Sequence, residues 1–378
     1  MTISMNRAMF ILGHAYGPNG ARGISTYFEG RPGGGKTTKV RSFARKYLDN
    51  NCLAFELSRS QGTDLNIPIP DHARKRVDFY TAGPIQDLAE KNNGILFFDE
   101  ITRANDQGTL AASLNIFLDR ALGDVKFKHI VTWACANPAG MVGGIELDVA
   151  FANRIVIVKW PDTMDVEDFA EHMNAVDPVT GVRDADTEWP PAPADWESKW
   201  SDMFEKAVRD MASFHRVRSG DLLEEEPPAS FRPWRSARSW HTATCVLAAC
   251  RLHGATSSET ETLLGGTIGP EAAHAFVAWL DNNNLPNPVD VCNGKVDLKK
   301  IPAEDVFVAL SAATDYFLNL RRKDLTEANK LNASFAKVLA DQLKHNMETV
   351  APVAGRIGRA SVTAPEFLQV YTPCLAIK

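Results

Sequence analysis

The sequence has none of the short motifs that mark several common classes of enzyme. Its six cysteines never occur as Cys-x-x-Cys, and none is spaced with a histidine pair as zinc ligands are. There is no His-Glu-x-x-His segment, which disfavours a zinc hydrolase, and no Gly-x-Ser-x-Gly elbow, which disfavours a Ser-His-Asp hydrolase. We therefore expect reduced, mostly buried thiols in a cytoplasmic protein.

Long runs of one residue class are also absent. No apolar stretch approaches the roughly 20 residues of a membrane span, and the apolar run at 10–12 is too short for a signal peptide. There is no long Lys/Arg run and the formal net charge is -6, so a nucleic-acid partner is not expected. The 378 residues are 44% apolar and 23% charged, which predicts a globular protein with two or three compact units.

One glycine-rich stretch dominates what is present. Residues 30–37 read Gly-x-x-x-x-Gly-Lys-Thr, with a β-prone run at 26–28 before them and a helix-compatible run at 39–48 after them. In this motif backbone N–H groups converge on phosphates, the lysine reaches the β- and γ-phosphates, and the threonine hydroxyl binds Mg²⁺. We expect a nucleoside triphosphate to bind at Gly30, Pro32, Gly33, Gly34, Gly35, Lys36, Thr37 and Thr38.

A second candidate site segment is the apolar run 94–98, which two acidic residues follow. The run is typical of a buried parallel strand, and ligands of open α/β sheets lie at the carboxyl ends of the strands. We expect Asp99 to hold Mg²⁺ together with Thr37, and Glu100 to polarise the attacking water.

The remaining strands and helices predict one α/β domain over 24–160. Strands are expected at 26–28, 52–57, 94–98, 130–136 and 155–158, with helices at 84–91 and 107–122, a loop or insertion at 58–76 and a hairpin tip at Gly123-Asp124. Asn137 follows the strand 130–136, where its amide could orient water or touch the γ-phosphate. A turn-forming Asn-Pro is the alternative. Residues 1–25 either pack near the nucleotide base or form a surface loop.

Four motifs together resemble AAA+ ATPases. They are Gly-x-x-Gly-x-Gly-Lys-Thr at 30–37, Phe-Asp-Glu-Ile-Thr-Arg-Ala at 98–104, Ala-Asn-Pro at 136–138 and Asn-Arg-Ile at 153–155. The second string is similar to that of the MoxR-like, dynein-related branch. The resemblance implies a P-loop AAA+ core with a five-stranded parallel sheet, followed by an α-helical lid and a helical C-terminal extension. It also implies that Asn137 is the sensor-1 residue and that Arg154 is an arginine finger acting on a neighbouring subunit's nucleotide.

The second half is similar to the lid of the same family. Ala-Arg-Ser-Trp at 237–240 resembles its Pro-Arg-Thr-Trp pattern, which implies that Arg238 is sensor 2, with Arg235 and Arg232 as weaker candidates. A basic surface cap is the alternative. The expected domains are a nucleotide-binding core at 1–161, a lid with an acidic, proline-rich insertion at 162–300 and a helical extension at 301–378, with long helices at 303–322 and 326–345.

The resemblance implies an ATP- and Mg²⁺-dependent homo-oligomer, a hexameric ring, that remodels a protein client with a partner carrying a von Willebrand factor A domain. Two alternatives stay open. One is a nucleic-acid motor or a subunit of a DNA-restriction machine, which the acidic balance disfavours. The other is a monomeric nucleotide switch, in which Arg154 would serve no neighbour. Preference for ATP over GTP is not decided by the sequence.

Overall fold

The computed structural model describes residues 3–104, 107–123, 125–138, 145–161, 166, 189–218, 220, 222–282, 285–345, 347–360, 362 and 364–375. The chain divides into two compact units. The first comprises Met1–Ala207 with Asp221–Val277, and the second comprises Val208–Gly220 with Ala278–Lys378. Most of the expected acidic insertion lies outside the described residues.

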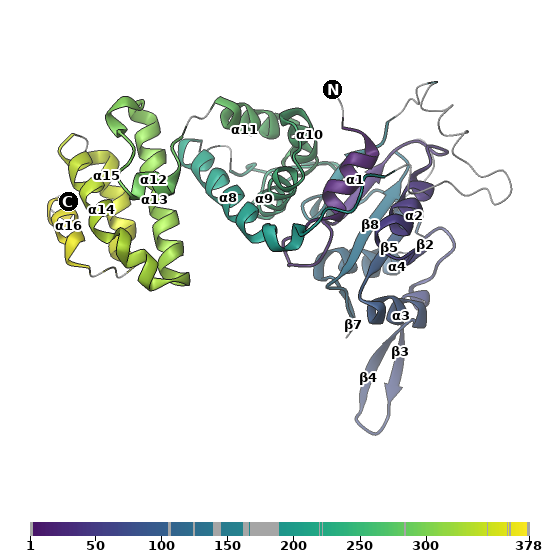
Figure 1. The fold of residues 1–378 in the computed structure, drawn as a ribbon. Helices are drawn as coiled ribbons and strands as arrows, with labels where there is room; N and C mark the ends of the chain where they lie inside the picture. The colour runs from purple at the N-terminus through teal and green to yellow at the C-terminus, as the bar shows by residue number, and fades with distance from the viewer. Residues whose placement is uncertain are drawn as a thin grey trace. The chain divides into compact units, whose positions relative to one another are not determined.

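A five-stranded parallel sheet organises the first unit (Figure 1). Its order is β2-β5-β8-β1-β9, and the expected α/β class and strand number are confirmed. The apolar strands β5 and β8 lie in the interior and are buried almost throughout, whereas β2 is an edge strand and is only half-buried rather than buried as expected. The strands are β1 (Thr26–Glu29), β2 (Cys52–Glu56), β5 (Gly94–Asp99), β8 (Ile130–Ala136) and β9 (Val156–Lys159).

Five helices of the described residues lie between 3 and 161 and accompany the sheet. They are α1 (Met5–Gly13), α2 (Lys36–Tyr47), α3 (Gly83–Lys91), α4 (Gln107–Asp119) and α5 (Val149–Ala152). The surface-loop reading is wrong for residues 5–13, because α1 is a largely buried helix. Helix α4 ends three residues earlier than expected, since Ala121 and Leu122 enter a hairpin instead.

Two hairpins leave the sheet region. Strands β3 (Asn66–Asp71) and β4 (Arg76–Thr81) pair antiparallel and extend away from the sheet (Figure 1). Residues 58–76 are therefore not a simple loop, because they hold β3 and the 3₁₀ turn η1 (Gly62–Asp64). The short strands β6 (Ala121–Leu122) and β7 (Val125–Lys126) confirm the second hairpin. Gly123 has a φ of 59° at its turn, and Asp124 lies outside the described residues.

Helices make up the rest of both units. In the first unit α10 packs on β9 so closely that a Cβ at Gly266 would lie 2.3 Å from the carbonyl oxygen of Ile157. In the second unit α13, α14 and α15 enclose a core around Phe317, Phe335 and Leu339, and both predicted long helices are confirmed. These helices are α8 (Trp196–Val217), α9 (Ala237–Leu252), α10 (Ser257–Ile268), α11 (Pro270–Asn282), α12 (Pro288–Cys292), α13 (Ala303–Lys323), α14 (Leu325–Leu343), α15 (Met347–Arg359) and α16 (Leu368–Leu375).

Candidate functional site

The glycine-rich loop connects the carboxyl end of β1 to the start of α2. Gly33 and Gly35 have φ values of 78° and 77°, a left-handed conformation that side chains rarely adopt. Gly35 caps α2 without a side-chain hydrogen bond, so the first N–H groups of the helix remain available to a ligand. Pro32, Gly33 and Thr38 are exposed on this loop. Such a helix start favours an anion by its dipole and its free N–H groups.

The Lys36 side chain lies across the loop. Its ammonium donates to the carbonyl oxygens of Gly30 at 2.6 Å and Arg31 at 2.8 Å, and more weakly to Oδ1 of Asn137 at 3.4 Å. Glu29 of β1 and Ala136 of β8 are paired residues, so the two strands bring the loop and the amide to one edge of the sheet. The structure thus brings Lys36 and Asn137 together.

Both carboxylate oxygens of Asp99 are held by neighbouring side chains. The Thr37 hydroxyl donates to Oδ2 at 2.5 Å, and the Cys135 thiol donates to Oδ1 at 2.9 Å. Burial, followed by the charge of Asp99, raises the pKa of Cys135 well above its ordinary value, which keeps the thiol a donor. Cys135 did not emerge from the sequence. Its place near the carboxyl end of β8, two residues before Asn137, was the available signal.

Thr37 and Asp99 fit the needs of Mg²⁺. They bring a hydroxyl and a carboxylate oxygen to the end of the glycine-rich loop, where α2 begins, and Mg²⁺ in phosphate-transfer sites takes few protein ligands beside phosphates and water. Among the described residues no group of three or more His, Cys, Asp or Glu side chains could hold a metal alone. A site completed by phosphate oxygens needs no such group.

Glu100 stands one residue beyond the end of β5 in a left-handed conformation, with φ 52°. Its Oε2 accepts a hydrogen bond from Arg103 at 3.1 Å, and its side chain is 29% exposed. The carboxylate is therefore at the same edge of the sheet as Asp99 but is engaged by an arginine that the sequence did not single out. To polarise water it must leave Arg103.

Arg154 lies at the amino ends of the strands, opposite the carboxyl ends that the glycine-rich loop follows. It precedes β9, whose register with β1 pairs Thr26 with Val156, whereas the glycine-rich loop follows the other end of β1. Its guanidinium donates to the carbonyl of Ala150 at 3.3 Å. Burial, and then the charge of Arg238, lower the pKa of Arg154. The structure thus groups Arg154 with Arg238 and separates both from Lys36.

Packing between α5 and the start of α9 explains this grouping. The Ser236 hydroxyl donates to Oδ1 of Asn153 at 2.5 Å, and the Trp234 indole donates to the carbonyl of Val149 at 3.2 Å. The two other candidate arginines point to Glu224, at 2.9 Å for Arg232 and 3.9 Å for Arg235. Arg238 is exposed, and its carbonyl accepts a hydrogen bond from the Thr242 hydroxyl at 3.3 Å, whereas its guanidinium makes no hydrogen bond or ion pair within the described ranges.

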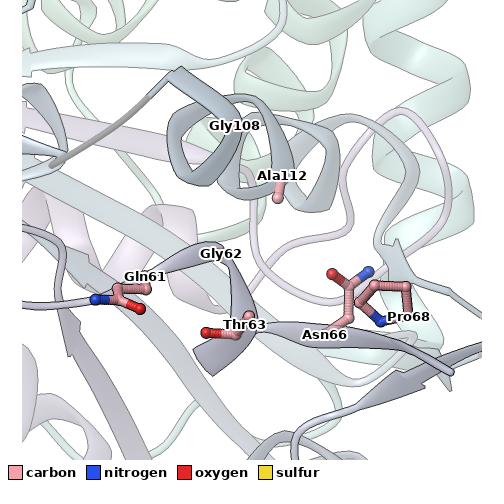
Figure 2. A pocket seen from close by; sticks show the side chains of 7 residues that line it. All are labelled: Gln61, Gly62, Thr63, Asn66, Pro68, Gly108 and Ala112. Atoms are coloured by element: carbon pink, nitrogen blue, oxygen red, sulfur yellow. The ribbon is translucent and has the colours of Figure 1, made fainter.

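A hollow of about 640 Å³ lies elsewhere, between the base of the β3–β4 hairpin and α4 (Figure 2). Figure 2 shows the side chains of Gln61, Thr63 and Asn66 below the small residues Gly108 and Ala112 of α4. None of its lining residues is among the predicted site residues, so it is separate from the glycine-rich loop.

Comparison with known proteins gives structural likenesses but no match in sequence. No protein-family model matches this chain, and no curated protein matches it. A solved structure from Cytophaga hutchinsonii, described as a candidate ATPase, is similar over 73% of this chain and 79% of that chain, with 16% identity and a TM-score of 0.39. A likeness this small carries no argument about function. Within the described part of the chain, no helix has the length and apolar character needed to cross a membrane.

Proposed function

We propose that this protein hydrolyses ATP with Mg²⁺ at the glycine-rich loop. The observation that carries the proposal is the convergence of Lys36, Thr37, Asp99 and Asn137 at one edge of the sheet. Hydrogen bonds of 2.5 Å for Thr37–Asp99 and 3.4 Å for Lys36–Asn137 join them. Triphosphate binding needs a cation, two hard oxygen donors and an amide beside the free N–H groups of a helix start, and these are the groups found here.

Each residue has one role in this proposal. The loop N–H groups and Lys36 bind the β- and γ-phosphates, while Thr37 and Asp99 hold Mg²⁺, which when bound neutralises charge on the phosphates. Glu100 leaves Arg103 and accepts a proton from the attacking water, because a carboxylate within hydrogen-bond reach acts as a general base. Asn137 stays beside Lys36 and orients the γ-phosphate.

The position of Arg154 supports a site completed by a second chain. Strand β9 separates Arg154 from the loop edge by about 10 Å along the sheet, and the guanidinium lies near Arg238 instead. Two neighbouring guanidinium groups repel one another, and a triphosphate would offset that repulsion. We propose that Arg154, with Arg238, serves the nucleotide of an adjacent subunit in a homo-oligomeric ring, which we take to be a hexamer.

The finer assignment follows the resemblance to MoxR-like AAA+ proteins. It gives a cytoplasmic ATPase that remodels or activates a protein client together with a von Willebrand factor A domain partner. The competing proposal, a nucleic-acid motor or restriction-machine subunit, predicts salt-dependent DNA binding, because phosphate contacts release counterions. DNA that neither binds nor stimulates turnover at low salt excludes it.

The nucleotide proposal is tested by two substitutions. Lys36→Ala should abolish binding of Mg·ATP, whereas Glu100→Gln should bind it and lose turnover by about 10²- to 10⁴-fold. Calorimetry measures binding and phosphate release measures turnover. Lys46→Ala, on the same helix α2, is the matched control and should change neither.

Wild-type levels of ATP binding in Lys36→Ala would contradict the proposal, as would full turnover in Glu100→Gln. Affinity capture with Glu100→Gln under ATP then tests the client and the partner, because a nucleotide-trapped ATPase retains what it holds. Recovery of nucleic acid instead of a protein would favour the competing proposal.

A further inference from the structure

Trp160 lies directly against the glycine-rich loop. It is the first residue after β9, at the same edge of the sheet as the loop, and its side chain is 7% exposed. A Cβ at Gly30 would lie 2.2 Å from Cβ of Trp160, and a Cβ at Gly34 would lie 3.3 Å from both Cδ1 and Nε1 of the indole. The ring therefore occupies the space that side chains at these two positions would need.

The contact with Gly34 is not required by the glycine-rich motif. The Gly-x-x-x-x-Gly-Lys-Thr pattern demands glycine at 30 and 35 but leaves position 34 free. Gly34 has no left-handed φ, unlike Gly33 and Gly35, so backbone conformation does not require glycine there. The indole of Trp160 favours glycine there, because a Cβ at Gly34 would lie 3.3 Å from two of its atoms, closer than an ordinary van der Waals contact.

The tryptophan itself is fixed by the sheet. Its backbone N–H donates to the carbonyl of Glu29 at 2.6 Å, which extends the pairing of β1 and β9 by one step. Its ring meets Phe28 edge-on with centroids 5.9 Å apart. A rigid ring held from two sides sets how far the loop can move toward β9.

We propose that Trp160 is a positioning residue for the phosphate-binding loop. The ring braces Gly30 and Gly34 on the β9 side, while Lys36 holds the carbonyls of Gly30 and Arg31. Bound phosphate requires the loop N–H groups to converge. A displacement of about 1 Å in such a site can lower the reaction rate by about 10²-fold. The inference rests on the proposed nucleotide site and adds a residue outside its motifs.

The test compares affinity for Mg·ATP by calorimetry. Trp160→Leu should raise Kd at least about tenfold, a change of about 1.4 kcal/mol, while Trp160→Phe should raise it less because a ring remains. Trp133→Phe is the matched control, since Trp133 also meets Phe28 edge-on, at 5.4 Å, but lies in the middle of β8, three residues before the carboxyl end of that strand. It should leave Kd unchanged.

A double-mutant cycle separates bracing from general stability. Gly34→Ala should weaken binding in the wild-type background, because the new methyl group presses on the indole, and should have less effect together with Trp160→Leu. Nucleotide should also change the tryptophan fluorescence of the wild type and of Trp133→Phe, but not of Trp160→Phe.

Two results overturn the inference while the proposed function stands. They are a wild-type Kd in folded Trp160→Leu or Trp160→Phe, and equal effects of Gly34→Ala in both backgrounds. If Trp160→Leu does not fold, Trp160→Phe with the fluorescence measurement decides. If the wild-type chain binds no Mg·ATP, the proposed function itself fails, and the inference fails with it.

Discussion

At the scale of single residues, the far edge of the sheet depends on a buried guanidinium with no carboxylate beside it among the described residues. Arg120 donates to the carbonyl of Ile130 at 2.8 Å, to the Thr132 hydroxyl at 2.9 Å and to the carbonyl of Gly23. Burial lowers its pKa to about 9. Buried carbonyls need hydrogen-bond donors, and Arg120 supplies them at the amino ends of the strands, opposite the phosphate-binding loop.

His14 gives the molecule a pH dependence. The ring is buried at the end of α1, where Nδ1 donates to the carbonyl of Phe10 at 2.9 Å and the Tyr47 ring packs edge-on. Burial lowers the pKa of His14 from 6.5 to about 3. Between these values the unfolded chain takes up a proton that the folded chain does not, so stability is complete above pH 6.5 and falls as pH falls toward 3.

We expect this histidine to remove about 1 kcal/mol from the free energy of unfolding between pH 7 and pH 5.5. His14→Phe keeps the ring and removes the titration, so its unfolding free energy should fall less over the same interval. Urea unfolding at the two pH values measures the difference. The exposed His72→Gln variant should behave like the wild type. Equal pH dependence in His14→Phe and the wild type would show that His14 is not the cause.

At the scale of elements, the parallel strands could be predicted because each is a short apolar run ending in polar or glycine residues. The same logic found Asp99 and Asn137 directly after two of these strands, whereas the glycine-rich motif gave Lys36 and Thr37. The β3 strand was missed because Pro68 and Pro70 argue against pairing. The Ala82 N–H donates to the carbonyl of Leu65, so the hydrogen-bonded pairs of this hairpin alternate from there. Pro68 and Pro70 therefore fall at non-hydrogen-bonded pairs, where the backbone nitrogen points away from the partner strand and no N–H is needed.

Contacts between distant segments could not be predicted in this way. Trp160 and Cys135 carry no motif, and their relevance comes from lying beside Gly34 and Asp99 after the strands have paired. The grouping of Arg154 with Arg238 likewise depends on the packing of α5 on the start of α9. From a single sequence it is easier to predict which helices and strands form than to predict which side chains come into contact.

Helix α10 offers a prediction with an internal control, because two adjacent glycines differ in their surroundings. A Cβ at Gly266 would meet the carbonyl of Ile157 at 2.3 Å, whereas a Cβ at Gly265 finds its nearest atom, in Pro270, at 3.5 Å. Gly266→Ala should therefore destabilise the fold by about 1–3 kcal/mol through overpacking. Gly265→Ala should stabilise it by up to about 1 kcal/mol through helix propensity.

Thermal and urea unfolding of the two variants measure this difference. Equal stability changes of the same sign would mean that α10 does not press on β9 as closely as the structure shows. A selective loss in Gly266→Ala would place the helix directly on the edge strand of the sheet.

At the scale of the whole molecule, the proposal requires one site to use two chains. Glu100→Gln and Arg154→Ala subunits should each be inactive alone. A 1:1 mixture should regain activity at about a quarter of its sites, since an Arg154→Ala subunit keeps Glu100 and can borrow Arg154 from its neighbour. Phosphate release from freshly mixed subunits measures the recovery.

The control for the mixture is Lys36→Ala with Glu100→Gln, in which no subunit has a complete set of its own loop and acid residues. That mixture should stay inactive. Recovery there would mean that Lys36 and Glu100 act from different chains, contrary to the proposed site. Full turnover in Arg154→Ala alone would mean that the arginine does not act between chains, and the monomeric switch would then be favoured.

Strand β9 connects two of these features over a very short distance. Trp160, at its carboxyl end, rests on the phosphate-binding loop of its own chain, and Arg154 precedes its amino end. If β9 moves as a rigid strand, a shift of the loop would move Arg154 with it. In the proposed ring, β9 would act as a mechanical strut between consecutive sites. The subunits would then hydrolyse ATP one after another rather than independently, because each site would set the timing of the next.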